Sequence, residues 1–524
     1  MKVTLPFIFI IALIAIGCNK KQNQKMNEAS AITIDAEKHR PLYHFTPAKK
    51  WMNDPNGMVF YEGTYHLFYQ HYPDNTVWGP MHWGHATSKD LVNWEHQPIA
   101  LYPDSLGYIF SGGAVADIKN TSGLGTNENP PLVAFFTYHD PVGAENGSDT
   151  FQTQGLAYSL DNGKSWIKYE NNPVISNPGI RDFRDPNVFW HEASQKWILL
   201  LAAQDKIMFY QSENLINWEF TSEFGENSGS HGGVWECPDL FSLPHPKNPD
   251  EMVWVLLVSI NPGGPNGGSV TQYFLGDFDG KSFKNQFPKE KTLWLDYGTD
   301  NYAGVTWSDI PKEDGRRIFI GWMSNWDYAN VVPTKSWRSA MTVPRKLKLK
   351  SGKEHILLTN EPVKELEQLR SASTDIESGV LEANRTLQTN NPLCELHLQI
   401  DLGESTAKKI GIKLSNDKSE KIIAAYHVEN QNYFIDRTGS GKHTFSDKFS
   451  GIHTAPRLVD NNIIELQVLV DVASIEFFAD EGRTVLTDIF FPTEPFNKIE
   501  LFTEGGSAKI IKGKSYTLSP SIIQ

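Results

Sequence analysis

The chain has 524 residues, too many for one ordinary core, so two domains are expected. Its 48 Lys and Arg stand against 62 Asp and Glu, and the net charge of -14 argues against nucleic acid as a partner, because phosphate binding needs a basic surface. Aromatic residues make up 12 % of the chain and include 15 Trp, the kind of ring that stacks on sugars.

The first residues form a targeting segment rather than part of the fold. The apolar run 3–16 is too short for a comfortable membrane span but suits a signal-peptide core. Ala15-Ile16-Gly17-Cys18 resembles the bacterial lipobox, so we expect a signal peptide over 1–17, lipid on Cys18 and a polar tether over 18–39. The resemblance predicts a bacterial lipoprotein, anchored to a membrane in the periplasm or at the cell surface. An ordinary cleaved signal with an incidental cysteine is the alternative.

The few cysteines of the chain indicate neither a disulfide scaffold nor a metal site. If Cys18 carries lipid, only Cys237 and Cys394 remain, too few for a disulfide-built scaffold. No Cys/His spacing suggests a zinc site. We therefore expect neither a metal nor a cofactor.

Residues 40–350 form a succession of short strand-like runs broken by Gly, Asn, Asp and Pro, without an amphipathic helix of ordinary length. A motif recurs in this region, as SKDLVNWE at 88–95 and SENLINWE at 212–219, with the variant SLDNGKSW at 159–166. Each copy is a polar hairpin turn followed by a Trp that can pack on its neighbour. Repeated β units with a recurring Trp are typical of a β-propeller.

The C-terminal part reads as a second domain. Residues 361–373 hold the best helical stretch, with Val363, Leu366 and Leu369 at helical spacing, inside an expected linker over 351–375. Beyond it, apolar and polar residues alternate as in half-buried antiparallel strands, which predicts a β-sandwich over residues 376–524. We expect this sandwich to brace the propeller, because no exposed aromatic platform stands out.

Three motifs set carboxylates beside aromatic residues and a proline. They are Trp51-Met52-Asn53-Asp54-Pro55-Asn56-Gly57, Phe183-Arg184-Asp185-Pro186 and Trp235-Glu236-Cys237-Pro238-Asp239. Pro55 pushes Asp54 towards extended geometry and Asn-Gly then favours a tight turn, so Asp54 is presented from a restricted strand end, as a nucleophile requires. Glu236 has largely uncharged neighbours, and such surroundings raise a carboxyl pKa and favour a proton donor.

Each motif alone also has a structural explanation. Asp54 could cap a turn, Arg184 and Asp185 could form a surface ion pair, and Glu236 could be a buried, hydrogen-bonded residue. A pair of carboxylates, one ionised and one protonated, is nevertheless the minimal equipment for cleaving a glycosidic bond.

Together the motifs resemble glycoside hydrolase family 32, the fructan hydrolases and invertases. Further matching stretches are Phe68-Tyr69-Gln70, Trp78-Gly79, Phe110-Ser111-Gly112, Tyr302-Ala303, the run 321–326 and the run 337–345. The resemblance implies an all-β fold, a five-bladed β-propeller followed by a C-terminal β-sandwich, with the site in the axial funnel. It implies β-fructofuranosyl substrates, mainly fructans cut from the chain end, with sucrose as a secondary substrate.

The resemblance also implies roles by position. Asp54 would attack the anomeric carbon, Glu236 would protonate the leaving oxygen and then activate water, and Asp185 with Arg184 would hold the fructose hydroxyls. A covalent intermediate requires the carboxyl groups of Asp54 and Glu236 to stand roughly 5–5.5 Å apart, and net retention follows. The residues expected to bind substrate are Trp51, Met52, Asn53, Gln70, Trp78, Phe110, Ser111, Arg184 and Trp326.

Several alternatives stay open at this point. An inverting propeller hydrolase of the arabinan or xylan type would hold its carboxyl groups roughly 6.5–9.5 Å apart. A non-catalytic fructan-binding lipoprotein could use the same fold. Fructosyl transfer to another sugar would share the covalent intermediate, and an endo-acting levanase or inulinase would need a more open funnel.

Overall fold

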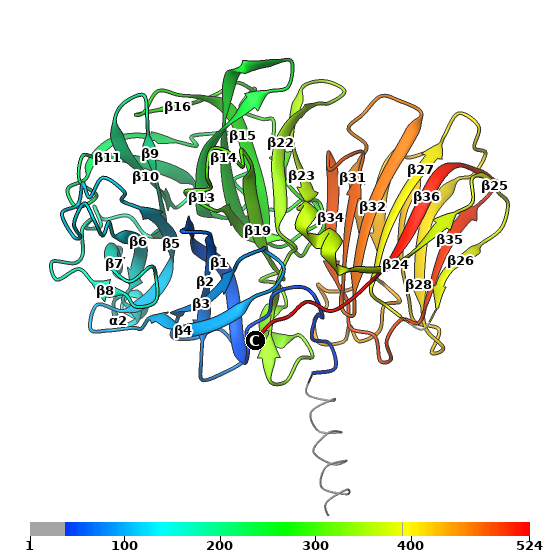
Figure 1. Cartoon of the computed structure of the whole chain (residues 1–524), viewed down its shortest axis with the longest axis horizontal. Helices are drawn as coiled ribbons and strands as arrows, with labels where there is room; N and C mark the ends of the chain where they lie inside the picture. The colour runs from blue at the N-terminus through cyan, green and yellow to red at the C-terminus, as the bar shows by residue number, and fades with distance from the viewer. Residues whose placement is uncertain (1–36, 390) are drawn as a thin grey trace, which may run out of the picture.

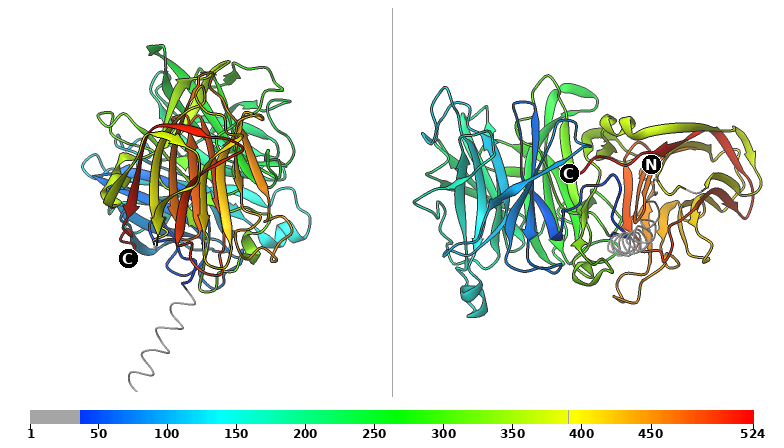
Figure 2. Two further views of the ribbon diagram at one scale, coloured as in Figure 1. Left: turned by 90° about the vertical axis from the view of Figure 1, so that its right-hand side faces the viewer. Right: turned by 60° about the horizontal axis from the view of Figure 1, so that its bottom comes forward.

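The computed structural model describes residues 37–389 and 391–524, so the predicted signal peptide over 1–17 and the predicted lipidation at Cys18 lie outside the described residues. It shows two bodies built of strands that lie side by side (Figures 1 and 2). Within the described part, α2 (Pro141–Glu145) is a single short turn, and no helix there has the length and apolarity needed to cross a bilayer. The all-β prediction of a five-bladed propeller followed by a sandwich is confirmed.

Five antiparallel sheets form the propeller, each starting at its inner strand. The strands of the first three blades are β1 (Lys50–Tyr61), β2 (Thr64–Tyr72), β3 (His82–Ser88) and β4 (Glu95–Leu101); β5 (Tyr108–Ala116), β6 (Leu132–His139), β7 (Gln152–Ser159) and β8 (Ile167–Lys168); β9 (Phe183–His191), β10 (Lys196–Ala203), β11 (Lys206–Ser212) and β12 (Glu219–Phe224). The other two contain β13 (Val234–His245), β14 (Asn248–Asn261), β15 (Val270–Phe278), β16 (Phe283–Asn285) and β17 (Leu293–Trp294); β18 (Tyr302–Thr306), β19 (Arg317–Met323), β21 (Ala340–Met341), β22 (Arg345–Ser351) and β23 (Ile356–Pro362).

The ring closes between the fifth blade and the first. β20 (Trp337–Arg338), which follows β19 and the short 3-10 helix η1 (Ala329–Val331), pairs in parallel with the start of β1. The indole of Trp307, the residue directly after β18, donates to the backbone oxygen of His66 in β2. Both faces of each blade pack on neighbours, which explains near-continuous apolar strands such as β10.

The repeated motif is the turn between the third and fourth strands of the first three blades. The Ser88 hydroxyl accepts from the backbone of Asp90 and Leu91, and the Ser212 hydroxyl accepts from Asn214 in the same way. Leu91 and Leu215 both have positive φ, 65° and 62°. The repeat therefore encodes one turn conformation at equivalent places in the propeller.

Two sheets form the sandwich around one apolar core. One contains β24 (Arg370–Ile376), β36 (Ala508–Leu518), β27 (Cys394–Asp401), β32 (Ile463–Asp471), β33 (Ser474–Ala479) and β34 (Thr484–Ile489), with β25 (Gly379–Leu381) also paired to β36. The other contains β26 (Arg385–Thr389), β35 (Lys498–Glu504), β28 (Lys409–Ser415), β29 (Lys421–His427), β30 (Asn432–Asp436) and β31 (Ile452–Pro456).

The segment 351–375, expected as a linker with a helix, is mostly strand. It contains β23 of the fifth blade, the 3-10 helix η2 (Lys364–Leu369) and most of β24 of the sandwich. Val363, Leu366 and Leu369 are buried as a helical face would be, but β24 pairs with β36 directly after η2, so the helix cannot continue. The two domains therefore join without a flexible connector.

Buried charges fix the two domains to each other. The Arg345 guanidinium of β22 contacts Asp296 of the propeller at 2.9 Å and also pairs with Glu476 of β33. The His44 ring lies between Asp471 at 2.8 Å and Glu476 at 2.7 Å, which raises its pKa to about 9 despite burial. The C-terminal tail then returns to the first blade, where the Trp94 amide donates to the Ile522 oxygen (Figure 1).

Candidate active site

A β-bulge interrupts the inner strand of all five blades. The register breaks between Met52 and Pro55, between Ile109 and Gly112, between Arg184 and Asn187, between Glu236 and Asp239, and between Tyr302 and Val305.

Local sequence explains these breaks. Asp185, Cys237 and Ala303 have positive φ of 62°, 46° and 52°, and proline after Asp54, Asp185 and Cys237 cannot donate a ladder hydrogen bond. Bulges re-aim side chains, and here they bring polar groups from the inner strands together.

Asp54 is held by donors from three inner strands. Its Oδ1 accepts from the Asn53 amide at 3.0 Å, and its Oδ2 accepts from the Ser111 hydroxyl at 2.8 Å and from the Cys237 thiol at 3.6 Å. Burial raises the pKa of Asp54, and these hydrogen bonds oppose the increase because they stabilise the charged form. The arrangement presents a fixed, ionisable oxygen, as nucleophilic attack needs.

Glu236 is placed between a cation and a phenol. Its Oε1 accepts from the Arg184 guanidinium at 2.8 and 3.2 Å, and its Oε2 accepts from the Tyr302 hydroxyl. Burial raises its pKa, Arg184 works against the increase, and the charge on Asp54 adds to it. A carboxyl group with a raised pKa beside a carboxylate is suited to donate a proton.

Asp185 lies beside both of these groups. Its Oδ2 accepts from the backbone N–H of Cys237 at 3.0 Å and stands 3.8 Å from Arg184 Nε. Burial raises its pKa to about 7; Arg184 lowers it, and the charges on Glu236 and Asp54 raise it. Its own backbone N–H donates to the Thr137 hydroxyl at 2.9 Å, which fixes the bulge.

The Cys237 thiol contacts the two aspartates. Sγ lies 3.6 Å from Asp54 Oδ2 and 3.7 Å from Asp185 Oδ2. Burial, followed by the neighbouring carboxylates, raises the pKa of this thiol well above its usual value. It therefore stays protonated and acts as a weak donor.

Aromatic side chains surround the carboxylates. Trp51 packs on Trp326 and Trp322 at centroid distances of 6.0 and 6.2 Å, and its indole donates to Asn53 Oδ1 at 2.7 Å. Trp78 meets Phe110 edge to face at 6.0 Å, and its side chain is 39 % exposed.

The structure brings the predicted catalytic residues together, although they are far apart in the sequence. Asn53, Ser111 and Arg184 contact the carboxylates that are predicted to be catalytic. Trp51 and Met52 have no exposed surface, so the contribution that the geometry shows for Trp51 is the support of Asn53.

Gln70, another residue expected to bind substrate, contacts none of the three carboxylates among the hydrogen bonds of the described residues. Gln70 is 2 % exposed and donates to Asn56 at 3.0 Å. Direct contact of Trp51, Met52, Gln70, Trp78, Phe110 and Trp326 with substrate stays a prediction.

Sequence reasoning missed two residues of the site. Tyr302 donates to Glu236, and Asp182 Oδ1 accepts from Arg184 Nη1 at 2.7 Å. Tyr302 occurs in one of the matching stretches, but nothing in its local sequence indicates a partner. Asp182 comes two positions before Arg184, and this spacing was the one sequence signal that could have indicated the ion pair between them.

Most of the chain is similar to known proteins. The model described as "Glycosyl hydrolases family 32 N-terminal domain" matches residues 44–361, and "Glycosyl hydrolases family 32 C terminal" matches residues 365–517. A levanase of Bacillus subtilis is 48% identical over 92% of this chain and 70% of the levanase. An extracellular exo-inulinase of Aspergillus niger is 38% identical over 92% of this chain and 95% of the inulinase. A crystal structure of exo-inulinase from Aspergillus awamori matches with a TM-score of 0.85 at 36% identity, covering 92% of this chain and 98% of that one.

Proposed function

Because the chain belongs to glycosyl hydrolase family 32, we propose that it hydrolyses β-fructofuranosyl linkages of fructans from the chain end and releases fructose. The levanase and exo-inulinase relatives, similar over most of this chain, support an exo-acting β-fructosidase. The observation that carries the proposal is the convergence of Asp54, Asp185 and Glu236, from three different blades, on one buried site.

The site supports a two-step mechanism. The Asp54 carboxylate forms a bond to the anomeric carbon of the terminal fructosyl unit while the glycosidic C–O bond breaks, and Glu236 gives its proton to the departing oxygen. Glu236, now ionised, then takes a proton from water as that water attacks the same carbon and the ester to Asp54 breaks. Each half-reaction inverts the anomeric centre, so the net outcome is retention.

The Asp185 carboxylate suits the hydroxyls and the developing positive charge of the sugar, and Arg184 positions the acid. Asp185 Oδ2 accepts from the Cys237 amide, and its Oδ1, which has no hydrogen-bond partner among the residues that the structure describes, can accept from a fructose hydroxyl. A carboxylate beside the oxocarbenium-like transition state stabilises its charge. Arg184 in turn holds Glu236 in place through two hydrogen bonds.

The test is a product time course with levan, inulin and sucrose. We expect free fructose as the first product from both polymers, and oligosaccharides before fructose would refute the exo mode. Glu236→Gln and Asp54→Asn should each lose roughly 10³-fold or more in kcat without loss of folding. Glu313→Gln, on an exposed residue, is the matched control and should keep full activity. Absence of turnover in the unmutated protein would support a fructan-binding module instead.

We further propose that the enzyme is a lipoprotein held at a membrane through Cys18 alone. The apolar run followed by Ala15-Ile16-Gly17-Cys18 supports this, and the net charge of -14 makes a nucleic-acid partner unfavourable. Expressed in a bacterial host, the full chain should partition into the detergent phase, and Cys18→Ala should move it to the aqueous phase. An aqueous full chain would contradict the anchor.

A further inference from the structure

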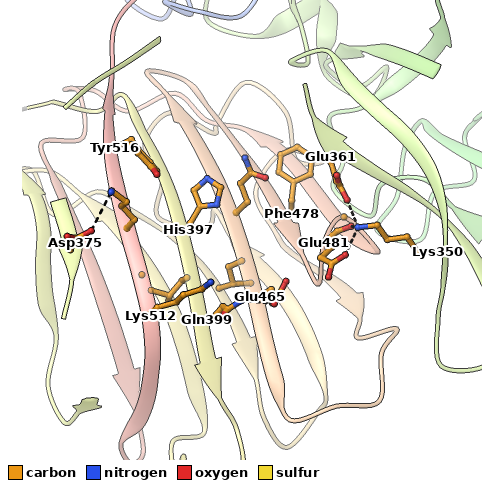
Figure 3. Close-up of a pocket in the computed structure, with 16 residues that line it drawn as sticks. Lys350, Glu361, Asp375, His397, Gln399, Glu465, Phe478, Glu481, Lys512 and Tyr516 are labelled. Atoms are coloured by element: carbon orange, nitrogen blue, oxygen red, sulfur yellow. Dashed lines mark hydrogen bonds and ion pairs between the residues drawn. The ribbon is translucent and has the colours of Figure 1, made fainter. Parts of the chain in front are cut away.

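A groove of about 720 Å³ crosses the outer face of the sandwich, and none of its lining residues belongs to the site around Asp54 (Figure 3). Its floor is the sheet of β24, β36, β27, β32 and β33. Its volume lies in the range of ligand-binding clefts.

The floor presents polar side chains in cross-strand rows. Along β27, Leu396 and Leu398 point into the sandwich core, and His397 and Gln399 alternate with them on the outer face. His397 pairs with Lys514 on one side and with Gln467 on the other. The rows run in register across the strands as Asp375, Lys514, His397, Gln467 and Phe478, and as Lys512, Gln399 and Glu465.

One wall of the groove comes from the propeller. Lys350 of β22 pairs with Glu361 of β23 and with Glu481 in the turn after β33, as the dashed lines in Figure 3 show. This contact joins the two domains across the groove. The wall is therefore fixed relative to the floor.

The groove is lined by three cations and four carboxylates, so its charges nearly balance, and most of them are paired. Lys514 stands 3.6 Å from Asp375, and Lys350 is held between two glutamates. The lining contains the cations Lys350, Lys512 and Lys514 and the carboxylates Glu361, Asp375, Glu465 and Glu481. A surface of this kind suits a neutral ligand better than a phosphate, which would need excess positive charge.

Hydrogen-bonding capacity remains open towards the groove. Gln399 and Gln467 donate to Glu465 at 2.6 Å and to Glu395 at 2.9 Å, and their carbonyl oxygens have no hydrogen-bond partner among the residues that the structure describes. The same holds, within that part of the chain, for the Tyr516 hydroxyl and the Lys512 ammonium. The Tyr516 ring is held by Arg370, whose guanidinium lies 4.2 Å from the ring centroid.

We propose that this groove is a second fructan-binding site, which holds a stretch of polymer away from the chain end that is cut. Donors and acceptors without protein partners, beside a fixed aromatic ring, match an uncharged chain that carries many hydroxyls. The sandwich thus contributes affinity for the polymer in addition to bracing the propeller. This inference rests on the proposed function.

The test measures binding of levan and inulin by the full chain carrying Glu236→Gln, in native gels that contain the polymer. His397→Ala/Gln467→Ala should weaken polymer binding about tenfold, as expected for the loss of two groups that hydrogen-bond a ligand. Lys512→Ala/Gln399→Ala should do the same without touching the contacts to buried Glu395. The matched control is His427→Ala/Asn432→Ala, a cross-strand pair of the same chemistry on the opposite sheet, which should bind as before.

In the otherwise active enzyme, the groove variants should raise KM for the polymers and leave sucrose hydrolysis unchanged. Unchanged polymer binding, or equal weakening by the control pair, would overturn the inference. A change from dimer to monomer in the groove variants would also overturn it, since the groove would then be a self-association surface. Failure of the proposed function is distinct, because the unmutated enzyme would then hydrolyse no β-fructoside at all.

Discussion

Arg184 lowers the pKa of Glu236, the proposed acid, so replacing Arg184 gives a test with a defined sign. Its guanidinium lies 2.8 Å from Glu236 Oε1. Burial raises the pKa of Glu236, and Arg184 lowers it. Arg184→Gln removes the opposing cation, so the pKa of Glu236 should rise further and the acid should keep its proton at higher pH.

The geometry bounds the size of the shift. Two unit charges 4 Å apart interact by about 4 kcal/mol at an effective dielectric constant of 20. One pKa unit corresponds to about 1.4 kcal/mol, so complete loss of the pair corresponds to about 3 units. Water and the glutamine amide replace part of the stabilisation, and we expect an upward shift of about 1–2 units.

The assay is kcat/KM for sucrose against pH, which reports the essential groups of the free enzyme. Loss of the Glu236 proton sets the alkaline limb, so Arg184→Gln should move that limb to higher pH and lower the maximum. Asp182→Asn is the opposing control, because the Asp182 charge raises the pKa of Glu236 and its removal should move the limb to lower pH. A downward shift in Arg184→Gln, or the same direction in both variants, would refute the reasoning.

Three other predictions concern the buried groups. Iodoacetamide should leave the folded enzyme fully active, because burial raises the pKa of the Cys237 thiol. Alkylation of Cys237, detected by peptide mass and accompanied by loss of activity, would contradict this prediction. Arg345→Ala leaves buried Asp296 without a cation and Glu476 with His44 alone, and it should lower the free energy of unfolding by about 3–5 kcal/mol in urea, whereas a change below about 1 kcal/mol would count against the network. The pKa of His44 is raised from 6.5 to about 9, so protonated His44 adds stability that is fully present below pH 6.5 and is lost as pH rises through about 9. Between pH 6.5 and 9, Tm should therefore fall less in His44→Gln than in the unmutated protein. An equal fall of Tm in both proteins would contradict this prediction.

The sequence predicted the architecture because its signals are local. The turn repeat at Ser88 and Ser212 and the prolines after Asp54 and Asp185 report backbone conformations that a few neighbouring residues determine. The same motifs identified Asp54 and Glu236. Their convergence follows from closure of five blades around one axis.

What the sequence could not show depends on pairing between distant segments. Tyr302 reaches Glu236 because the inner strands β13 and β18 carry bulges at matching positions. The local sequence near either residue does not predict how these strands are aligned. The helix expected over 361–373 became η2 and a strand, since pairing of β24 with β36 overrides local helical spacing. The groove around His397 likewise exists only once four other strands have aligned beside β27.

Retention of configuration is the direct consequence of an ester between Asp54 and fructose. Methanol traps the outcome, because a methyl fructoside does not mutarotate as free fructose does. Sucrose hydrolysis in aqueous methanol, followed by NMR, should give methyl β-fructofuranoside beside fructose. Methyl α-fructofuranoside, or no methyl fructoside at any methanol concentration that the enzyme tolerates, would contradict a covalent intermediate on Asp54.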